Sequence, residues 1–315
     1  MKILIIGTGA IGVALAASLA EVGEEVSLIA RGDTYRYISE KGVARRGLFG
    51  DVDISADRIR TFCDYSAIKE SFDYIIITTK SLANEEVAKK LSGNGQLFSG
   101  STRIVIGQNG WGNTASYEKY FDRKIIYNAR IITGFARLNP GTSNITVHTA
   151  PVLIGSLFGE CKEAVEPLAA AINSSGIPSQ ASEELEEALW AKMLYNTTLN
   201  PLGAILGCAY GKLTESEYSV KIMNQLIEET FAVIKACGFK CYWKDAAEYE
   251  ELFYGKLIPD TYGHRSSTLQ DIEKKIPTEI DTLNGCIIRL GKEKSIATPA
   301  HSLIYNLIKS IEAGY

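Results

Sequence analysis

A glycine-rich turn close to the amino terminus constrains the fold more than any other feature of the chain. Residues 3–6 form a short apolar run, which is typical of a central parallel strand covered on both faces. Residues 7–12 then read Gly-Thr-Gly-Ala-Ile-Gly, and an alanine- and leucine-rich segment that predicts a helix continues to Gly23. A strand, a GxGxxG turn and a helix in this order predict a Rossmann dinucleotide-binding fold.

Each glycine of this turn has its own expected task. Gly7 makes the tight turn, Gly9 lets the backbone approach a pyrophosphate, and Gly12 lets the helix pack close to the strand. The N–H groups and the positive dipole end at the helix N-terminus favour phosphate. The residues that we assign to cofactor binding on this basis are Gly7, Thr8, Gly9, Ala10, Ile11 and Gly12.

The end of the second predicted strand, residues 25–30, indicates which dinucleotide binds. NAD-binding folds usually carry an acid here, but this chain has Arg31, with Arg36 about one helical turn further on. Guanidinium groups pair with a 2′-phosphate, so we expect the cofactor to be NADP(H). Asp33 leaves an alternative open, because a slightly longer loop would return its carboxylate to the ribose hydroxyls.

Two further polar residues follow predicted strands. Lys80 comes after the predicted buried strand 73–79, and Asn109 comes shortly after the run 103–106. Ligands of open α/β sheets bind outside the carboxyl ends of the strands, so both side chains are candidates for the same site. The alternatives are a solvated lysine that opens a helix and a turn-forming Asn-Gly pair.

The remaining pattern predicts two domains, as the length of 315 residues also suggests. Several short β-like runs between residues 123 and 158 are expected to finish the sheet, and a helix is expected near residues 160–174. Beyond a boundary at Gly176 the chain is strongly helical. We therefore predict an α/β protein with an NADP-binding Rossmann domain over residues 1–176 and an all-helical substrate-binding and catalytic domain over residues 177–315.

Within the helical part, residues 190–211 contain an unusual polar flank. Lys192, Asn196 and Asn200 are four residues apart, so on a helix they fall on one flank about 80° wide. Apolar residues surround them, which favours a site over a solvated face. The alternative is a surface lysine with capping asparagines, because Asn200 precedes Pro201 and proline disfavours helix in the residue before it.

Two helix starts are predicted further along. Ser267 and Gln270 have the spacing of a capping box, which makes Ser267 an expected N-cap. Thr278 follows a proline and precedes Glu279, so we expect another helix to begin there, with the acid in its first turn. A helix N-terminus with a serine hydroxyl is also a suitable place to bind a carboxylate.

Composition narrows the class of partner. The formal net charge is −4 with 22% charged residues, so nucleic acid is not an expected partner. Six cysteines without a CxxC pair and three histidines indicate neither a disulfide framework nor a metal site. No apolar run reaches the roughly 18 residues that a membrane span needs, and no signal region precedes the first strand. We expect a reduced, cytoplasmic protein that acts on a small molecule, with a homodimer left open.

Together these motifs resemble the ketopantoate reductase (2-dehydropantoate 2-reductase) family. The resemblance spans residues 1 to about 290, in the family's order. The residues that carry it are the turn GTGAIG, Lys80, Gln108-Asn109-Gly110, the run from Lys192 to Leu202, Ser266 to Asp271, and Pro277 to Asp281. It implies a Rossmann domain, a helical domain, a cleft between them, and NADPH-dependent reduction of 2-dehydropantoate to pantoate, a step toward coenzyme A.

The resemblance also implies roles for individual residues. Lys192 is the expected proton donor, and Glu279 is expected in the catalytic site and near the cofactor. The implied substrate-binding residues are Asn109, Asn196, Asn200 and Ser267, and Lys80, Ala136 and Asn109 are implied as cofactor contacts.

One position departs from the family pattern. Tyr210 stands ten residues after Asn200, where the family usually has an asparagine. A tyrosine offers one hydroxyl and no carboxamide, so the identity of the 2-oxo acid stays open. The alternatives are another branched 2-oxo acid as the substrate, or a dinucleotide-sensing protein without turnover.

Overall fold

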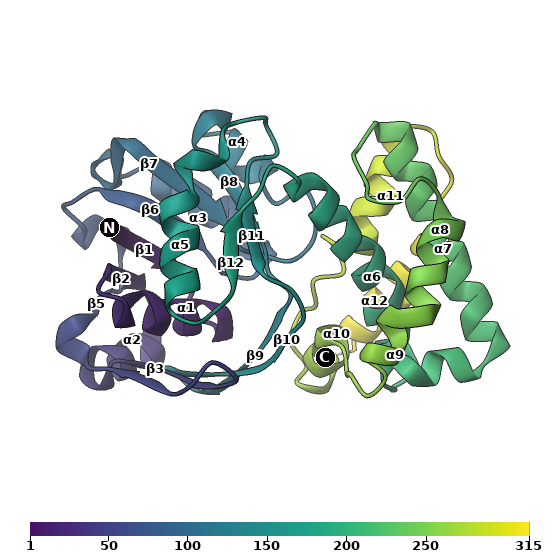
Figure 1. The fold of residues 1–315 in the computed structure, drawn as a ribbon, viewed down its shortest axis with the longest axis horizontal. Coiled ribbons are helices and arrows are strands. Elements are labelled where there is room, and N and C mark those ends of the chain that lie inside the picture. The colour runs from purple at the N-terminus through teal and green to yellow at the C-terminus, as the bar shows by residue number, and fades with distance from the viewer. Residues whose placement is uncertain (315) are drawn as a thin grey trace. The chain divides into compact units, whose positions relative to one another are not determined.

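A computed structural model describes residues 1–314 of the chain. These residues fold into two compact units. The first contains residues 1–108 and 113–185, and the second contains residues 109–112 and 186–314. Figure 1 shows the elements of each unit.

An eight-stranded sheet forms the centre of the first unit. Its strands lie in the order β12-β11-β8-β7-β6-β1-β2-β5; β8 and β11 pair antiparallel, and the other neighbours pair parallel. The strand bounds of the unit are β1 Lys2–Ile6, β2 Glu25–Ile29, β3 Val43–Gly47, β4 Val52–Ile54, β5 Arg60–Phe62, β6 Phe72–Ile77, β7 Phe98–Ile106, β8 Ile126–Arg130, β9 Thr133–Asn139, β10 Thr142–His148, β11 Val152–Gly155 and β12 Ser179–Ala181.

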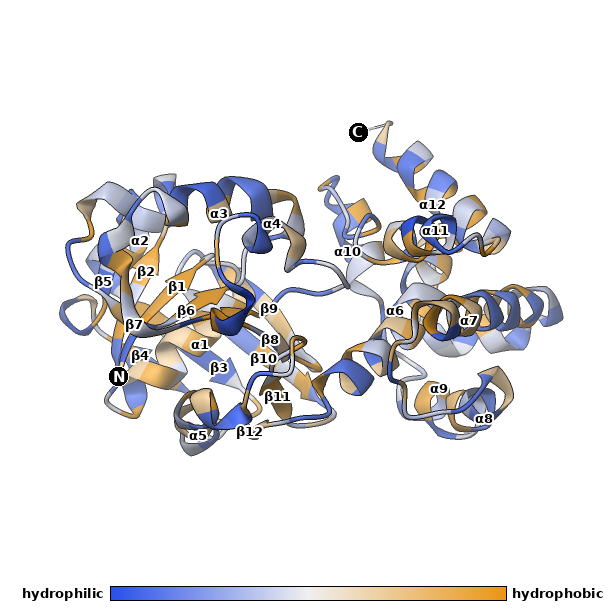
Figure 2. Ribbon diagram, turned by 90° about the horizontal axis from the view of Figure 1, so that it is seen from above, coloured by the Kyte–Doolittle hydropathy of each residue, from blue (hydrophilic) through white to orange (hydrophobic). Residues whose placement is uncertain are grey.

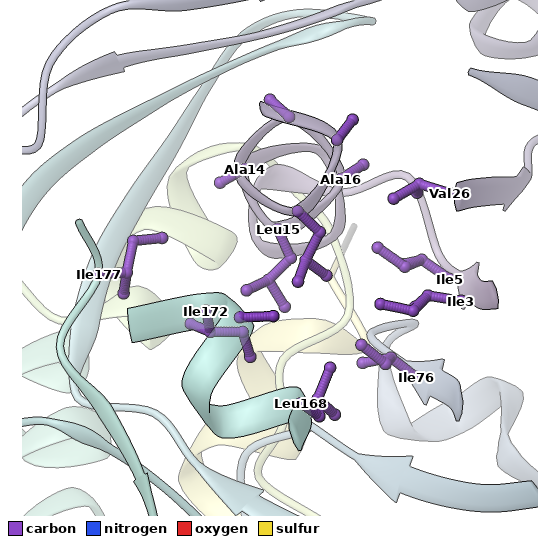
Figure 3. Close-up of a cluster of buried hydrophobic side chains, with 14 of the residues drawn as sticks. Ile3, Ile5, Ala14, Leu15, Ala16, Val26, Ile76, Leu168, Ile172 and Ile177 are labelled. Atoms are coloured by element: carbon purple, nitrogen blue, oxygen red, sulfur yellow. The ribbon is translucent and has the colours of Figure 1, made fainter. Parts of the chain in front are cut away.

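Helices cover both faces of this sheet. Their bounds are α1 Ala10–Glu21, α2 Gly32–Lys41, α3 Asn84–Ser92, α4 Ala115–Glu118 and α5 Glu166–Ser174. Ile3 and Ile5 of β1 pack with residues of α1 and α5 on one face (Figure 3), whereas Leu4 and Ile6 pack with residues of α3 on the other. This double coverage explains the unbroken apolar runs in the sequence. The central strands are accordingly hydrophobic in Figure 2, and α3 is largely hydrophilic.

The strand order reverses beside β1. The chain passes from β1 to β2 on one side and later returns to the other side of β1 as β6. The loops after β1 and β6 therefore leave the sheet at the point where ligands of open α/β sheets bind. The glycine turn directly follows β1, which confirms the predicted Rossmann arrangement.

A second sheet corrects the expected course of residues 123–158. β8 and β11 join the main sheet as expected, but β9 and β10 pair with β3 and β4 in a separate four-stranded sheet packed against α1. The Pro140-Gly141 turn folds β9 and β10 into a hairpin. Ile145 of β10 then packs in the same core as Val43 and Ile54. If the hairpin lay at the edge of the main sheet, these two side chains would be left uncovered.

The second unit is built from helices. Their bounds are α6 Leu185–Ile205, α7 Glu217–Cys237, α8 Ala246–Leu252, α9 Ile258–Asp260, α10 Ser267–Glu273, α11 Asn284–Glu293 and α12 Pro299–Glu312, with a 3-10 turn at Tyr210–Glu215 and a π turn at Phe253–Leu257. Through residue 314 this unit contains no strand, which confirms the all-helical prediction. α7 ends at Gly238 in a left-handed conformation, as its sequence indicates.

The first unit extends beyond the predicted boundary at residue 176. Ser179–Ala181 pairs with Val152–Ile154 as a parallel edge strand, so this segment belongs to the main sheet. In the other direction, residues 109–112 belong to the second unit, although their neighbours in the chain belong to the first.

Helix α6 runs through Pro201 to Ile205. The alternative in which Asn200 ends this helix is therefore wrong. Trp190, Met193, Leu194 and Leu199 of α6 lie in the core of the second unit, and this burial outweighs the local effect of proline.

None of the helices in residues 1–314 is both long and apolar enough to cross a membrane. Within the same range no group of three or more His, Cys, Asp or Glu residues could hold a metal ion. All six cysteines are free thiols, as their spacing in the sequence indicates.

Candidate active site

The glycine turn of the first unit has the geometry that its glycines predict. Gly7 has a φ of +113°, which glycine adopts readily. A Cβ on Gly12 would lie 1.9 Å from the carbonyl oxygen of Gly7, so α1 approaches the turn too closely for any larger residue. A Cβ on Gly9 would meet no atom within 4 Å, so the space beside the N-terminus of α1 is open. This open space fits a pyrophosphate.

Thr78 ties the glycine turn to the end of β6. Its hydroxyl donates a hydrogen bond to the carbonyl oxygen of Gly7 at 2.8 Å, and its N–H donates to the carbonyl oxygen of Ile6 at 2.8 Å. The run 73–79 predicts only a strand here. The sequence feature that could have predicted this hydrogen bond is the Thr78-Thr79 pair, because it places hydroxyl groups at the end of that strand.

The predicted NADP-selecting residues lie at this same edge of the first unit. Arg31 follows β2, and its Nη2 donates to Oε1 of Glu86 at 2.8 Å, with both side chains exposed. Arg36 does not join it, because Arg36 pairs with Asp33. Arg31 and Asp33 are thus each in an exposed ion pair, and such pairs are worth little.

The other two cofactor candidates of the first unit are exposed. Lys80 lies directly before the short 3-10 turn Ser81–Ala83 that follows β6. Ala136 lies on β9, in the four-stranded sheet that packs against α1. Both residues are thus accessible in the half of the molecule that carries the glycine turn.

A chain of hydrogen bonds joins three predicted residues in the second unit. The Lys192 ammonium donates to Oδ1 of Asn109 at 2.6 Å, and Nδ2 of Asn109 donates to Oε2 of Glu279 at 2.9 Å. Lys192 and Asn109 are half-buried, and Glu279 is 9% exposed. The Asn109 carboxamide therefore accepts from the cation and donates to the carboxylate, which fixes the orientation of all three groups.

The short loop 109–112 brings Asn109 into this unit. The N–H of Trp111 donates to the carbonyl oxygen of Thr282 at 3.1 Å, and Gly110, at φ +89°, lies so close to Thr282 that a Cβ there would be 2.5 Å from it. The Trp111 ring packs 4.8 Å from that of Trp190, at the start of the polar flank of α6. Asn109-Gly110 is thus more than a turn, because the glycine permits the contact that positions the asparagine.

Glu279 does not lie in a helix as predicted. Glu279 lies at a bend directly before the turn of residues 280–283, and α11 begins at Asn284. The Thr278 hydroxyl and N–H both donate to Glu312, so the expected capping residue is held by a carboxylate of α12 instead. This bend presents Glu279 to Asn109.

The polar flank of α6 has the predicted spacing. Lys192, Asn196 and Asn200 all lie within one continuous helix. Asn196 is half-buried and Asn200 is 5% exposed. One ammonium and two carboxamides therefore share a flank, as their spacing of four residues requires.

Tyr210 contacts this flank directly. Its hydroxyl donates to Oδ1 of Asn200 at 2.5 Å, and its ring lies edge-on to that of Tyr195, with 5.6 Å between the centroids. Burial raises the pKa of Tyr210, so its hydroxyl keeps its proton and remains a donor. The bond leaves the Asn200 carboxamide with its NH₂ group to offer, so Asn200 is arranged to bind a hydrogen-bond acceptor.

The N-cap of α10 is Ser266 and not Ser267. The Ser266 hydroxyl accepts from the N–H of Leu269 and donates to the carbonyl oxygen of Asn200, both at 3.0 Å. Ser267 is the first residue of the helix, and it is exposed. The N-cap therefore lies one residue before the predicted one. The Ser267 hydroxyl does not cap the helix, and Ser266 joins α10 to α6.

The fold and these two groups of residues define a class of protein. The first unit has an open glycine turn at the switch point of a Rossmann sheet, and the second has a lysine ammonium beside carboxamides. These features are typical of a dinucleotide-dependent oxidoreductase.

The chain belongs to the ketopantoate reductase family. The model described as "Ketopantoate reductase PanE/ApbA" matches residues 3–158, and its carboxyl-terminal counterpart matches residues 184–312. A 2-dehydropantoate 2-reductase of Aquifex aeolicus is 37% identical, with 99% of this chain and 97% of that protein covered. One from Pyrococcus horikoshii is 30% identical, with 99% and 98% covered.

Solved structures show the same fold over the full length. A ketopantoate reductase family protein from Ralstonia eutropha JMP134 has a TM-score of 0.84 at 27% identity, with 100% of this chain and 99% of that chain covered. A D-mandelate dehydrogenase in complex with NADH and anilino(oxo)acetate has a TM-score of 0.87 at 25% identity, with the same coverage. The family is one of enzymes, so the alternative of a sensor without turnover is not supported.

Substitution of Gly9 separates cofactor binding from folding. We expect Gly9→Ala to keep the wild-type urea midpoint, because its Cβ meets no protein atom, but to weaken NADPH binding about tenfold or more by filling the pyrophosphate space. Gly12→Ala is expected to lower the urea midpoint as well, since its Cβ would overlap Gly7. Nucleotide fluorescence titration and urea denaturation measure the two effects.

Gly95→Ala is the matched control for this test. Gly95 lies in the same unit, and a Cβ there also meets no atom within 4 Å. If Gly9→Ala binds NADPH as tightly as Gly95→Ala does, the pyrophosphate does not approach the Gly9 backbone.

Proposed function

We propose that the protein catalyses the NADPH-dependent reduction of 2-dehydropantoate to (R)-pantoate, with Lys192 as the proton donor. The observation that carries the proposal is the half-buried Lys192 ammonium, which donates a hydrogen bond to Asn109. Lys192 lies on the same flank of α6 as Asn196 and Asn200. The full-length similarity to named 2-dehydropantoate 2-reductases supports the reaction type.

The chemistry needs an electrophile beside the reduced carbonyl. When bound, a nicotinamide would supply a hydride to the ketone carbon, and negative charge would then grow on the ketone oxygen. The Lys192 ammonium stabilises this charge and donates its proton to the oxygen, which completes the hydroxyl group. Asn109 and Glu279 hold the ammonium in place through their hydrogen bonds, so little reorganisation is needed during the reaction.

The remaining residues of the flank suit a hydroxylated acid. Asn196 and Asn200 offer amide donors, and Ser267 offers an exposed hydroxyl at the N-terminus of α10. We assign the substrate carboxylate and hydroxyl groups to these residues, because hydrogen bonds to polar groups discriminate between substrates better than apolar contacts do.

A second candidate is the reduction of another branched 2-oxo acid by the same mechanism. Tyr210 favours it, since a buried phenol takes the place where the family usually has an asparagine and engages Asn200. The structural similarity to a D-mandelate dehydrogenase solved with NADH and anilino(oxo)acetate also supports this candidate.

For the cofactor, we propose NADPH over NADH. Arg31 is an exposed guanidinium at the carboxyl end of β2, and its exposed ion pair with Glu86 is weak enough for a 2′-phosphate to replace. This arrangement favours a 2′-phosphate over free ribose hydroxyls. The NADH of the D-mandelate dehydrogenase complex makes the preference a point to test in this chain.

Removal of the Lys192 ammonium tests the mechanism. We expect Lys192→Ala to reduce kcat by about 10²- to 10⁴-fold, since a positioned general acid contributes about this much. NADPH affinity should stay near wild type, because the proposed dinucleotide contacts of the glycine turn lie in the other unit. Steady-state kinetics and nucleotide fluorescence measure the two quantities.

Lys212→Ala is the matched control, because Lys212 is an exposed lysine of the same unit that pairs with Glu215. It should turn over normally. A near-normal kcat in Lys192→Ala would contradict the assignment of the proton donor.

Replacement of Arg31 tests the cofactor preference. We expect Arg31→Ala to weaken NADPH binding about tenfold or more and to change NADH binding little, because only NADPH carries the 2′-phosphate. Arg60→Ala is the control, since Arg60 is the first residue of β5, which runs parallel to β2, and so lies toward the amino ends of the strands while Arg31 follows the carboxyl end of β2. Equal losses for the two dinucleotides would point instead to ribose recognition by Asp33.

A further inference from the structure

Pro201 interrupts the hydrogen bonding of α6 in the middle of its polar flank. A proline has no N–H, so the carbonyl four residues earlier in the helix loses its donor. In α6 this carbonyl belongs to Thr197, which is 0% exposed. Water therefore does not reach it, and a buried carbonyl without a donor is costly.

The side chain of Asn284 replaces the missing donor. Its Nδ2 donates to the carbonyl oxygen of Thr197 at 3.0 Å. Asn284 is the first residue of α11 and is 0% exposed. A side chain from a distant part of the sequence thus completes the helix at the turn that separates Asn196 from Asn200.

His301 determines which way the Asn284 carboxamide faces. Burial lowers the pKa of His301 to about 4, so the ring is neutral at neutral pH. Its Nε2 lies 3.0 Å from the carbonyl oxygen of Leu226, which can only accept, so the proton belongs on Nε2. Nδ1 is then an acceptor, and it lies 3.0 Å from Nδ2 of Asn284.

Two acceptors, the Thr197 carbonyl and His301 Nδ1, therefore face Asn284 from opposite sides of its NH₂ group. The reversed carboxamide would set oxygen against both. Among residues 1–314, Oδ1 of Asn284 has no hydrogen-bond partner. The two acceptors thus keep the NH₂ group of Asn284 directed at α6.

Helix α7 fixes His301 in turn. The carboxylate of Glu229 accepts from the N–H groups of Ala300 and His301, at 2.9 and 3.1 Å, at the start of α12. The hydroxyl of Thr230 lies 3.0 Å from Nε2 of His301. The network therefore connects α7, α12 and α11 to one carbonyl of α6.

We propose that Asn284 is a positioning residue, which replaces the hydrogen bond that Pro201 removes from α6 and thereby holds Asn196 and Asn200 in register with Lys192. Asn284 acts through the helix backbone, by its bond to the Thr197 carbonyl. The effect on the 2-oxo acid rests on the proposed function, whereas the replacement of the hydrogen bond does not.

A rescue experiment tests this role. We expect Asn284→Ala to raise the KM for the 2-oxo acid about tenfold, with a smaller change in kcat and none in NADPH affinity. Pro201→Ala restores an N–H that can donate to Thr197. The double variant should therefore recover a KM within about threefold of that of Pro201→Ala alone. The urea midpoint should recover only in part, because Nδ1 of His301 still lacks the donor that Asn284 supplies.

Asn224→Ala is the control, because Asn224 is a half-buried asparagine of the same unit that accepts from Tyr254 and lies on α7, away from the flank. It should leave the KM unchanged. The proposal is overturned if Asn284→Ala has the same effect with and without Pro201, or if it leaves the KM at the wild-type value.

The two levels of the proposal fail in different ways. If the wild-type protein reduces no 2-oxo acid, the proposed function fails, and the urea midpoints of the four combinations still test whether Pro201→Ala rescues Asn284→Ala. If Asn284→Ala does not fold, recovery of folding in the double variant supports the replacement. Failure of both to fold contradicts it, because the bond to the Thr197 carbonyl would then not be the contact through which Asn284 acts.

Discussion

The hydrogen bond from the Lys192 ammonium to Asn109 is the contact on which the proposed chemistry of the second unit depends. It places a cation on the half-buried flank of α6. The Asn109 carboxamide, which accepts from this cation, donates in turn to the Glu279 carboxylate. Several otherwise unrelated features serve this contact. Gly110 lets the short loop approach Thr282, the Trp111 ring packs beside Trp190, and the bend after residue 277 presents the carboxylate.

Much of the first unit could be predicted from the sequence because its signals are local. An apolar run of four residues, a glycine turn and an alanine-rich helix follow one another within about one βα unit, and each has a single good conformation. Gly7 and Gly12 have the geometry expected of them for steric reasons that depend only on neighbouring backbone. The spacing of Lys192, Asn196 and Asn200 was equally predictable, since helical periodicity alone places them on one flank.

The features that could not be predicted depend on partners distant in the chain. β9 and β10 leave the main sheet to pair with β3 and β4, where Ile145 packs with Val43 and Ile54 in the core that covers α1. Ser266 caps α10 instead of Ser267 because it also reaches the carbonyl of Asn200. Pro201 suggests a helix end, and the helix continues because buried residues on both sides of it pack in the core and Asn284 supplies the lost donor.

The most direct test of the account is the loss of NADPH absorbance when 2-dehydropantoate is added to the wild-type protein, beside a panel of other branched 2-oxo acids. The account predicts the highest kcat/KM with 2-dehydropantoate, which would show that the phenol of Tyr210 is compatible with this substrate. A higher kcat/KM with another acid would keep the fold and the role of Lys192 but move the function to the second candidate. No oxidation of NADPH with any of the acids would contradict the proposed activity.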